Sequence, residues 1–141
     1  MPIIAVFSLN QKFKTLEKET KNILRRSLKS LRRQNVQLDV YLAGKGQMLA
    51  LNRKFRGKNS PANVLSFKEN NDFIYPPSGA ERLGEIYLNV PYVRHRAAKN
   101  ESMAVLLIHG LLHLLGYTHN KKSDRIEMER LEKSLFKKQN G

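Results

Sequence analysis

The hydrophobic positions change their spacing several times along the chain, and each spacing predicts one kind of secondary structure. Residues 2–8 form a short run rich in Ile, Val and Phe, which indicates a half-buried strand. From Leu16 to Leu31 the apolar residues recur every three or four positions, which is the spacing of one face of a helix. Residues 36–42 alternate between apolar and polar side chains, so we expect a second strand there.

The rest of the chain continues this mixture of short strands and helices. The pattern predicts a helix over residues 47–55, strands over 63–67 and 83–90, a long loop over 69–82, and helices over 91–98, 103–115 and 123–138. Four strands and four or five helices in mixed order favour an α+β fold, in which helices cover a small mixed four-stranded sheet. A chain of 141 residues is expected to form a single domain, residues 1–141.

The composition adds a strong positive charge to this picture. The chain has 26 Lys and Arg against 12 Asp and Glu, a formal charge of +14 at pH 7. Such an excess repels itself in a compact fold unless a polyanion is a usual partner, so nucleic acid is the first candidate and an anionic membrane surface the second. The predicted first helix carries a basic stripe opposite its apolar face, which is either a solvated surface or a face for RNA or a membrane. The residues of this basic stripe are Lys18, Lys21, Arg25, Lys29 and Arg32.

Several classes of protein are disfavoured by what the sequence lacks. Without cysteine there are no disulfides, thiol nucleophiles or thiolate metal sites, so any metal must be held by His, Asp or Glu. A signal peptide has a basic stretch before its apolar segment, and the apolar run at the N-terminus of this chain lacks one. The longest apolar segment, residues 104–116, is shorter than the ~20 residues that a bilayer requires. We therefore expect a soluble, cytoplasmic protein, and of the two candidate partners we favour nucleic acid and no membrane.

The candidate chemistry lies in a cluster of three histidines, His109, His113 and His119. His109 and His113 are four residues apart, so on a helix their rings project from the same side and can reach one ion. Gly116 can end the helix in a left-handed conformation and let the chain return His119 to the same point. Three imidazoles with a fourth position open to water suit zinc, one ion per chain, which would lower the pKa of that water or polarise a phosphoryl oxygen. The alternative is that these are core histidines satisfied by hydrogen bonds, but each would need a polar partner inside an apolar helix.

The same stretch also weighs against a protease. Metzincin proteases have the motif H-E-x-x-H-x-x-G-x-x-H, whose Glu is the general base. This chain keeps the histidines and the glycine at that spacing, but Gly110 occupies the position of the Glu. A metal centre is therefore predicted without the proton acceptor that peptide hydrolysis requires.

Three blocks of the sequence resemble the YbeY family of bacterial endoribonucleases. Residues 109–119 match the signature H-G-x-L-H-L-x-G-Y-D-H at all but one fixed position. Residues 52–58 and 63–67 are similar to the blocks N-x-x-Y-R and T-D-V-L-S-F, and residues 83–86 are similar to L-G-D-I. The resemblance spans about residues 36–136, and its histidine block is highly specific.

The resemblance implies a zinc site at His109, His113 and His119 and metal-dependent cleavage of single-stranded RNA. It further implies a role in 16S rRNA 3′-end maturation and ribosome quality control, with ribosomal RNA and the small ribosomal subunit as partners. The family's phosphate-binding arginine falls on Arg56, which we expect to be catalytic.

The sequence departs from the family pattern at three positions. Thr118 replaces an Asp, and Ala62 and Asn63 replace Thr-Asp. A carboxylate that would orient a ligand is lost at position 118, and Glu85 or Asp124 is a candidate substitute.

A basic cluster and a strand serine complete the candidate RNA site. Arg53, Lys54 and Lys58 lie close to Arg56 in the sequence, just before the predicted third strand, and Ser66 lies within it. We interpret these four as RNA-binding residues, although Arg53 and Lys54 are also explained as cations at the C-terminal end of a helix.

Two other functions remain open on the sequence alone. The first is a non-catalytic, zinc-containing, rRNA-binding factor of ribosome assembly, and the second is a metalloprotease-like hydrolase.

Overall fold

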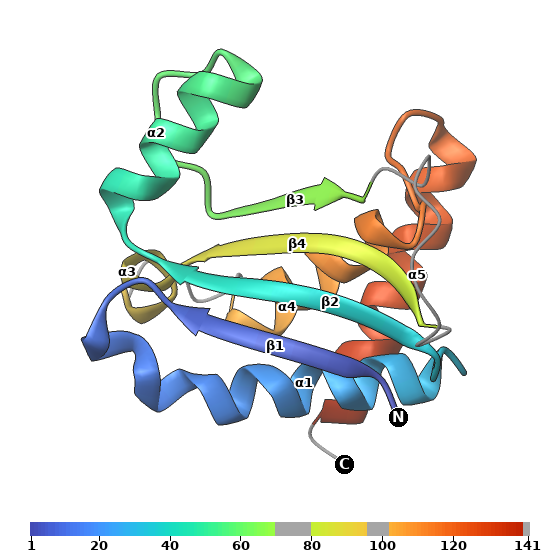
Figure 1. Cartoon of the computed structure of the whole chain (residues 1–141). Helices are drawn as coiled ribbons and strands as arrows, with labels where there is room; N and C mark the ends of the chain where they lie inside the picture. The colour runs from blue at the N-terminus through green and yellow to red at the C-terminus, as the bar shows by residue number, and fades with distance from the viewer. Residues whose placement is uncertain (70–79, 96–101, 140–141) are drawn as a thin grey trace.

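The computed structural model describes residues 1–69, 80–95 and 102–139 of the chain (Figure 1). The strands are β1 (Ile3–Ser8), β2 (Val36–Ala43), β3 (Val64–Lys68) and β4 (Glu81–Asn89). The helices are η1 (Gln11–Leu16, a 3-10 helix), α1 (Glu17–Ser30), α2 (Lys45–Arg56), α3 (Val90–Arg94), α4 (Met103–Leu114) and α5 (Lys122–Gln139). Within the described residues, no helix combines the length and apolar character that crossing a membrane requires.

The four strands form one mixed sheet in the order β1-β2-β4-β3. β1 pairs with β2 and β2 with β4 in parallel, whereas β3 pairs with β4 in antiparallel orientation. Among the strands of the described residues, β3 is therefore an edge strand, paired only with β4. The α+β class and the small mixed sheet predicted from the sequence are confirmed.

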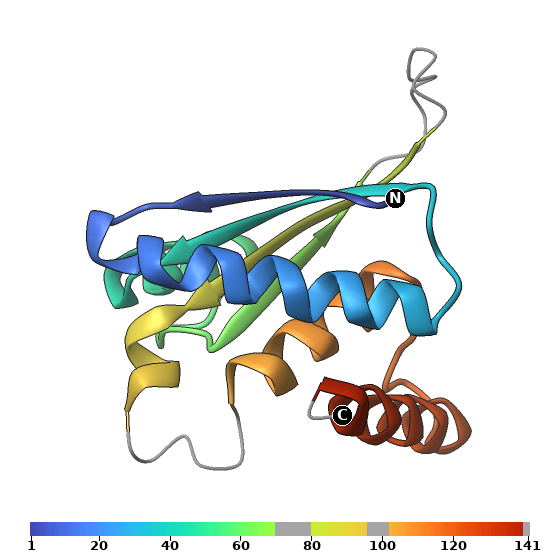
Figure 2. The ribbon, with the colours of Figure 1, turned by 90° about the horizontal axis from the view of Figure 1, so that it is seen from below.

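Three helices cover one face of the sheet in two layers. Figure 2 shows α1, α4 and α5 on the same side, with α4 between the sheet and α5. The alternating residues Val36, Leu38, Val40 and Leu42 of β2 are all buried, as are Leu24 and Leu28 of α1 and six leucines or isoleucines of α4. α4 is thus the central helix, which explains why its sequence is apolar on almost every side.

The opposite face of the sheet is partly covered by α2, through a small cluster of Ala43, Met48 and Leu65. Beside it, a row of stacked rings crosses the strands, with Tyr41 between Phe7 and Tyr87 at centroid separations of 5.1 and 4.7 Å. Burial, followed by the charge of Glu85 and its hydrogen bond, raises the pKa of both tyrosine hydroxyls. Glu85 therefore lies on the face away from α4.

The predicted elements need three corrections. β4 begins at Glu81, not at residue 83, because the backbone N–H of Glu81 donates to the carbonyl of Asn35 and extends the pairing with β2. The pattern gave no sign of this extension, since Glu81 and Arg82 are polar. η1 was not predicted either. The helix predicted over 91–98 ends earlier, at Arg94, because His95 is extended with a ψ of 142°. Residues 70–79 of the predicted loop and residues 96–98 lie outside the described residues.

Candidate metal centre and RNA-facing cavity

The central helix α4 is placed by signals at both of its ends. The hydroxyl of Ser102 accepts a hydrogen bond from the backbone N–H of Val105 at 3.3 Å and caps the first turn. After Leu114 the chain leaves the helix at Gly116, whose φ of +101° lies in the region that favours glycine. The backbone N–H of Tyr117 returns to the carbonyl of Leu112 at 3.0 Å, so the chain folds back against the helix that it has just left. This turn carries His119 toward the helical pair.

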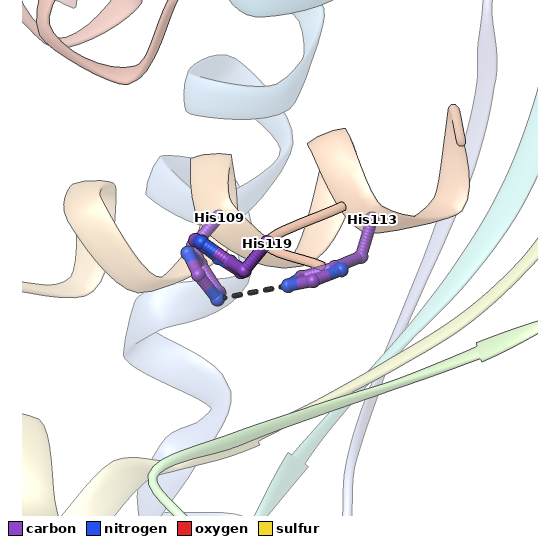
Figure 3. A group of neighbouring side chains, drawn as sticks. All are labelled: His109, His113 and His119. Atoms are coloured by element: carbon purple, nitrogen blue, oxygen red, sulfur yellow. Dashed lines mark hydrogen bonds between the residues drawn. The ribbon is translucent and has the colours of Figure 1, made fainter. Parts of the chain in front are cut away.

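The three histidines meet at one point (Figure 3). One ring nitrogen from each of His109, His113 and His119 lies within 4.8 Å of the others. The Nε2 atoms of His109 and His113 are 3.0 Å apart. The ring of His119 lies 5.1 and 5.2 Å, centroid to centroid, from the rings of His109 and His113. The common point predicted from the spacing is therefore present.

These donors fit a single metal ion. Nitrogens bound to zinc at about 2.0–2.1 Å and tetrahedral angles lie about 3.4 Å apart, so no pair needs to close by more than about 1.4 Å. His119 is exposed and lies on a turn, so it can make that movement, while His109 and His113 are half-buried on a helix. Burial, followed by the nearby charges of His109, His119 and Arg56, lowers the pKa of His113. A lowered pKa favours the neutral imidazole, which is the form that binds metal.

A carboxylate completes one side of the cluster. Oε1 of Glu132 on α5 lies 3.0 Å from Nδ1 of His109, on the opposite side of the ring from Nε2. The two candidates proposed from the sequence do not take this position. Glu85 is on the other face of the sheet, and Asp124 accepts a hydrogen bond from the hydroxyl of Thr118 at 3.4 Å.

Gly110 is explained by the close approach of α4 to β3. A Cβ at this position would lie 2.9 Å from Oγ of Ser66 and 3.2 Å from Cγ2 of Ile86. Ser66 donates a hydrogen bond to the Gly110 carbonyl at 3.0 Å and ties the strand to the helix. A glutamate at position 110, as in the metzincin motif, would run into β3.

A cavity of about 280 Å³ opens beside the histidines. It is lined by Arg56, Val64, Ser66, Lys68, His109, His113 and Leu114. A second cavity, of about 380 Å³, has Val64 and His109 in its lining, as the first has. His109 therefore borders both cavities.

Arg56 reaches the first cavity because of how α2 ends. Gly57, with a φ of +64°, stops the helix immediately after Arg56. The buried side chain of Asn52 donates to the carbonyl of Ser60 at 2.7 Å and holds the returning loop against the helix. β3 then begins at Val64, next to α4.

The predicted RNA-binding residues divide into two groups. Ser66 lines the first cavity with Arg56, as described above. Arg53, Lys54 and Lys58 are exposed and lie outside its lining. Nε of Arg53 donates to the side-chain oxygen of Asn59 at 2.6 Å, and Nζ of Lys54 lies 5.3 Å above the Phe55 ring.

Sequence reasoning missed Lys68 and Glu132. Lys68 shares a face of β3 with Val64 and Ser66, so the two-residue period of the strand could have indicated it. Glu132 is four residues from the buried Met128 on α5, at the edge of the apolar face, and that unusual position for a carboxylate was an available signal.

Known proteins are similar to this chain in sequence and in fold. The sequence model of the family described as endoribonuclease YbeY matches residues 6–140. An endoribonuclease YbeY from Chelativorans sp. is 38% identical over 105 residues, which cover 70% of this chain and 63% of that protein. An endoribonuclease YbeY from Sulfurihydrogenibium sp. is 31% identical over 129 residues, 86% of this chain and 82% of that protein.

A solved structure is also similar to this chain in its fold. The solution structure of TM1509 from Thermotoga maritima superposes with a TM-score of 0.58 at 26% identity and covers 98% of this chain and 92% of that one. With a family match over nearly the whole length, and with the histidine cluster in place, the chain belongs to the YbeY family of endoribonucleases.

Proposed function

We propose that this chain is a zinc-dependent endoribonuclease that cleaves single-stranded RNA at the cavity between α2, β3 and α4. The observation that carries the proposal is that three imidazoles have converging nitrogens and that two of them, His109 and His113, line one cavity with Arg56. The family name of the relatives and the charge of +14 agree with a polyanionic substrate.

In this proposal one group of side chains binds the metal ion and another binds the phosphate. His109, His113 and His119 would bind the zinc through neutral nitrogens. When bound, zinc supplies Lewis acidity, which polarises a phosphoryl oxygen and lowers the pKa of coordinated water. Arg56 would form paired hydrogen bonds to the phosphate and stabilise the negative charge that grows as the phosphorus is attacked. Lys68, from the same cavity, adds a second positive charge.

The shape of the site supports an extended substrate. Because Val64 and His109 border two cavities, we propose that a strand of RNA lies across both, past the histidines. A-form double helices are wide and rigid, whereas a single strand can bend into such a groove. This geometry supports the proposed preference for single-stranded RNA.

The biological setting follows from the same proposal. We propose that the substrate is ribosomal RNA, at the 3′ end of the 16S rRNA in the small ribosomal subunit, and that the protein acts in the cytoplasm in ribosome maturation and quality control. The limited base-specific chemistry of the cavity agrees with recognition of backbone charge and shape.

The proposal is tested by RNA cleavage with and without a chelator in three variants. His113→Ala is expected to lose metal and cleavage together. Arg56→Ala is expected to keep the metal and to lose about 100-fold or more in the cleavage rate at saturating RNA, since it removes a donor to the developing charge. Arg25→Ala, an exposed arginine on α1, is the matched control and is expected to cleave at the normal rate.

Three results would count against the proposal. Cleavage that survives both EDTA and His113→Ala would contradict a metal-dependent nuclease. Metal binding in a protein that cleaves no RNA would favour the non-catalytic assembly factor. Digestion of casein would favour the protease, which the contact between Gly110 and β3 argues against.

A further inference from the structure

The contact between Glu132 and His109 joins two helices that are far apart in the sequence. His109 belongs to α4, the central helix, and Glu132 to α5, which packs on the outside of it. The two side chains are 30% and 22% exposed, so the contact is shielded from much of the solvent. At 3.0 Å the carboxylate oxygen is at hydrogen-bonding distance from Nδ1.

The direction of this hydrogen bond fixes which nitrogen of His109 carries the proton. An ionised carboxylate can only accept, so Nδ1 must donate. In a neutral imidazole with Nδ1–H, the other nitrogen, Nε2, has a free lone pair. This is the nitrogen of His109 that lies 3.0 Å from Nε2 of His113.

The protonation of His113 in the metal-free protein then follows. Since Nε2 of His109 has no proton, the contact between the two Nε2 atoms is a hydrogen bond only if His113 donates from Nε2–H. Glu132 therefore fixes the direction of two successive hydrogen bonds: the carboxylate accepts from His109, and His109 accepts from His113.

We infer that Glu132 is a positioning residue, which holds His109 by a hydrogen bond from Nδ1–H so that the lone pair of Nε2 points to the shared metal position. The family pattern has a carboxylate at position 118, next to His119, where this chain has Thr118. Here Glu132 offers a carboxylate from α5 instead, and it contacts His109. This inference rests on the proposed function, since it assigns the three histidines to one ion. Outer carboxylates of this kind change metal affinity or activity by about 10–100-fold when they are removed.

The first test is the affinity for zinc, measured by competition with a chromophoric chelator. Glu132→Ala is expected to bind zinc about 10–100-fold more weakly than the unmodified protein. Glu132→Gln keeps a side-chain oxygen at the same reach and is expected to recover part of that loss. Glu129→Ala, which removes an exposed carboxylate from the same helix, is the matched control and is expected to bind normally.

The second test needs no metal and reads the histidine tautomers directly. Nitrogen NMR of the imidazole rings at about pH 8, where an ordinary imidazole is neutral, distinguishes Nδ1–H from Nε2–H. His109 is expected to be the Nδ1–H form and His113 the Nε2–H form in the unmodified protein. Glu132→Ala is expected to remove the preference at His109, and Glu132→Gln to retain most of it.

The outcomes separate this inference from the proposed function. If His109→Ala binds zinc as tightly as the unmodified protein, the metal site itself is wrong. If His109→Ala loses zinc but Glu132→Ala binds it normally and keeps the His109 tautomer, the positioning role is wrong. If Glu132→Gln is no better than Glu132→Ala in both tests, the carboxylate acts through its charge and not by the hydrogen bond, which also overturns the inference.

Discussion

Single side chains in the histidine cluster were the most predictable part of the molecule. The spacing of His109 and His113 fixes their common side on a helix, and Gly116 takes the left-handed conformation that returns His119. The partners of these rings were not predictable, because they come from other elements. Neither the hydrogen bond from Ser66 to Gly110 nor the contact of Glu132 with His109 is visible until the elements are placed in space.

The lowered pKa of His113 predicts a dependence of stability on pH in the metal-free protein. Below the ordinary histidine pKa, about 6.5, His113 binds a proton in the unfolded chain but stays neutral in the folded protein until the pH reaches its lowered pKa. Protonation therefore favours unfolding, and the free energy of unfolding falls as pH drops from about 6.5 through the lowered value. Urea denaturation with EDTA between about pH 5 and about pH 8 should show a smaller decline for His113→Gln than for the unmodified protein.

The comparison with the variant isolates this histidine, since carboxylates and the other histidines titrate in both proteins. Parallel curves for His113→Gln and the unmodified protein would show that burial does not lower the pKa of His113.

At the scale of helices and strands, the period of the hydrophobic pattern was a good guide to each element. The alternation in β2 and the three-to-four spacing in α1 correspond to residues that are buried in the structure. The start of β4 was not predictable, because backbone hydrogen bonds extend it through the polar residues Glu81 and Arg82. The order of the strands in the sheet could not be predicted from the hydrophobic pattern either, because no local sequence signal places β4 between β2 and β3.

The contact between α4 and β3 predicts that Gly110→Ala destabilises the fold. The new methyl group meets Oγ of Ser66 at 2.9 Å, and overpacking of this kind costs about 1–3 kcal/mol. Alanine gains up to about 1 kcal/mol over glycine in a helix, so the expected net loss is about 1 kcal/mol in the free energy of unfolding. Gly46→Ala in α2, where a Cβ meets nothing within 4 Å, is the matched control and is expected to be neutral or stabilising.

A double-mutant cycle with Ser66→Ala identifies the atom responsible. Removing Oγ relieves the closest contact, so the two substitutions together are expected to cost at least about 0.5 kcal/mol less than their sum. Strict additivity would place the strain elsewhere on β3.

For the whole molecule, composition and charge indicated a nucleic-acid partner before any site was known. They could not say which basic surface faces the RNA, because basic residues occur on most elements. The structure places the cluster of Arg53, Lys54 and Lys58 on the helix that delivers Arg56 to the cavity, whereas none of the described α1 residues lines that cavity.

This arrangement predicts that charge near α2 affects RNA binding more than the same charge on α1. Lys54→Gln combined with Lys58→Gln should weaken binding to all single-stranded sequences alike. It should also reduce the slope of log affinity against log salt by up to about 1.4, if both lysines contact phosphates. The control is Lys18→Gln with Lys29→Gln, which removes the same charge from exposed positions of α1. Equal effects of the two pairs would show that RNA is not localised at the cavity.

The central claim is that one ion is held jointly by three imidazoles, and zinc stoichiometry and affinity test it most directly. Titration of the metal-free protein should show one zinc per chain, with severe loss of affinity in His109→Ala, His113→Ala and His119→Ala. His95→Ala, which removes the chain's other histidine, should bind like the unmodified protein. Normal zinc affinity in any one of the three cluster variants would contradict the shared site and the activity derived from it.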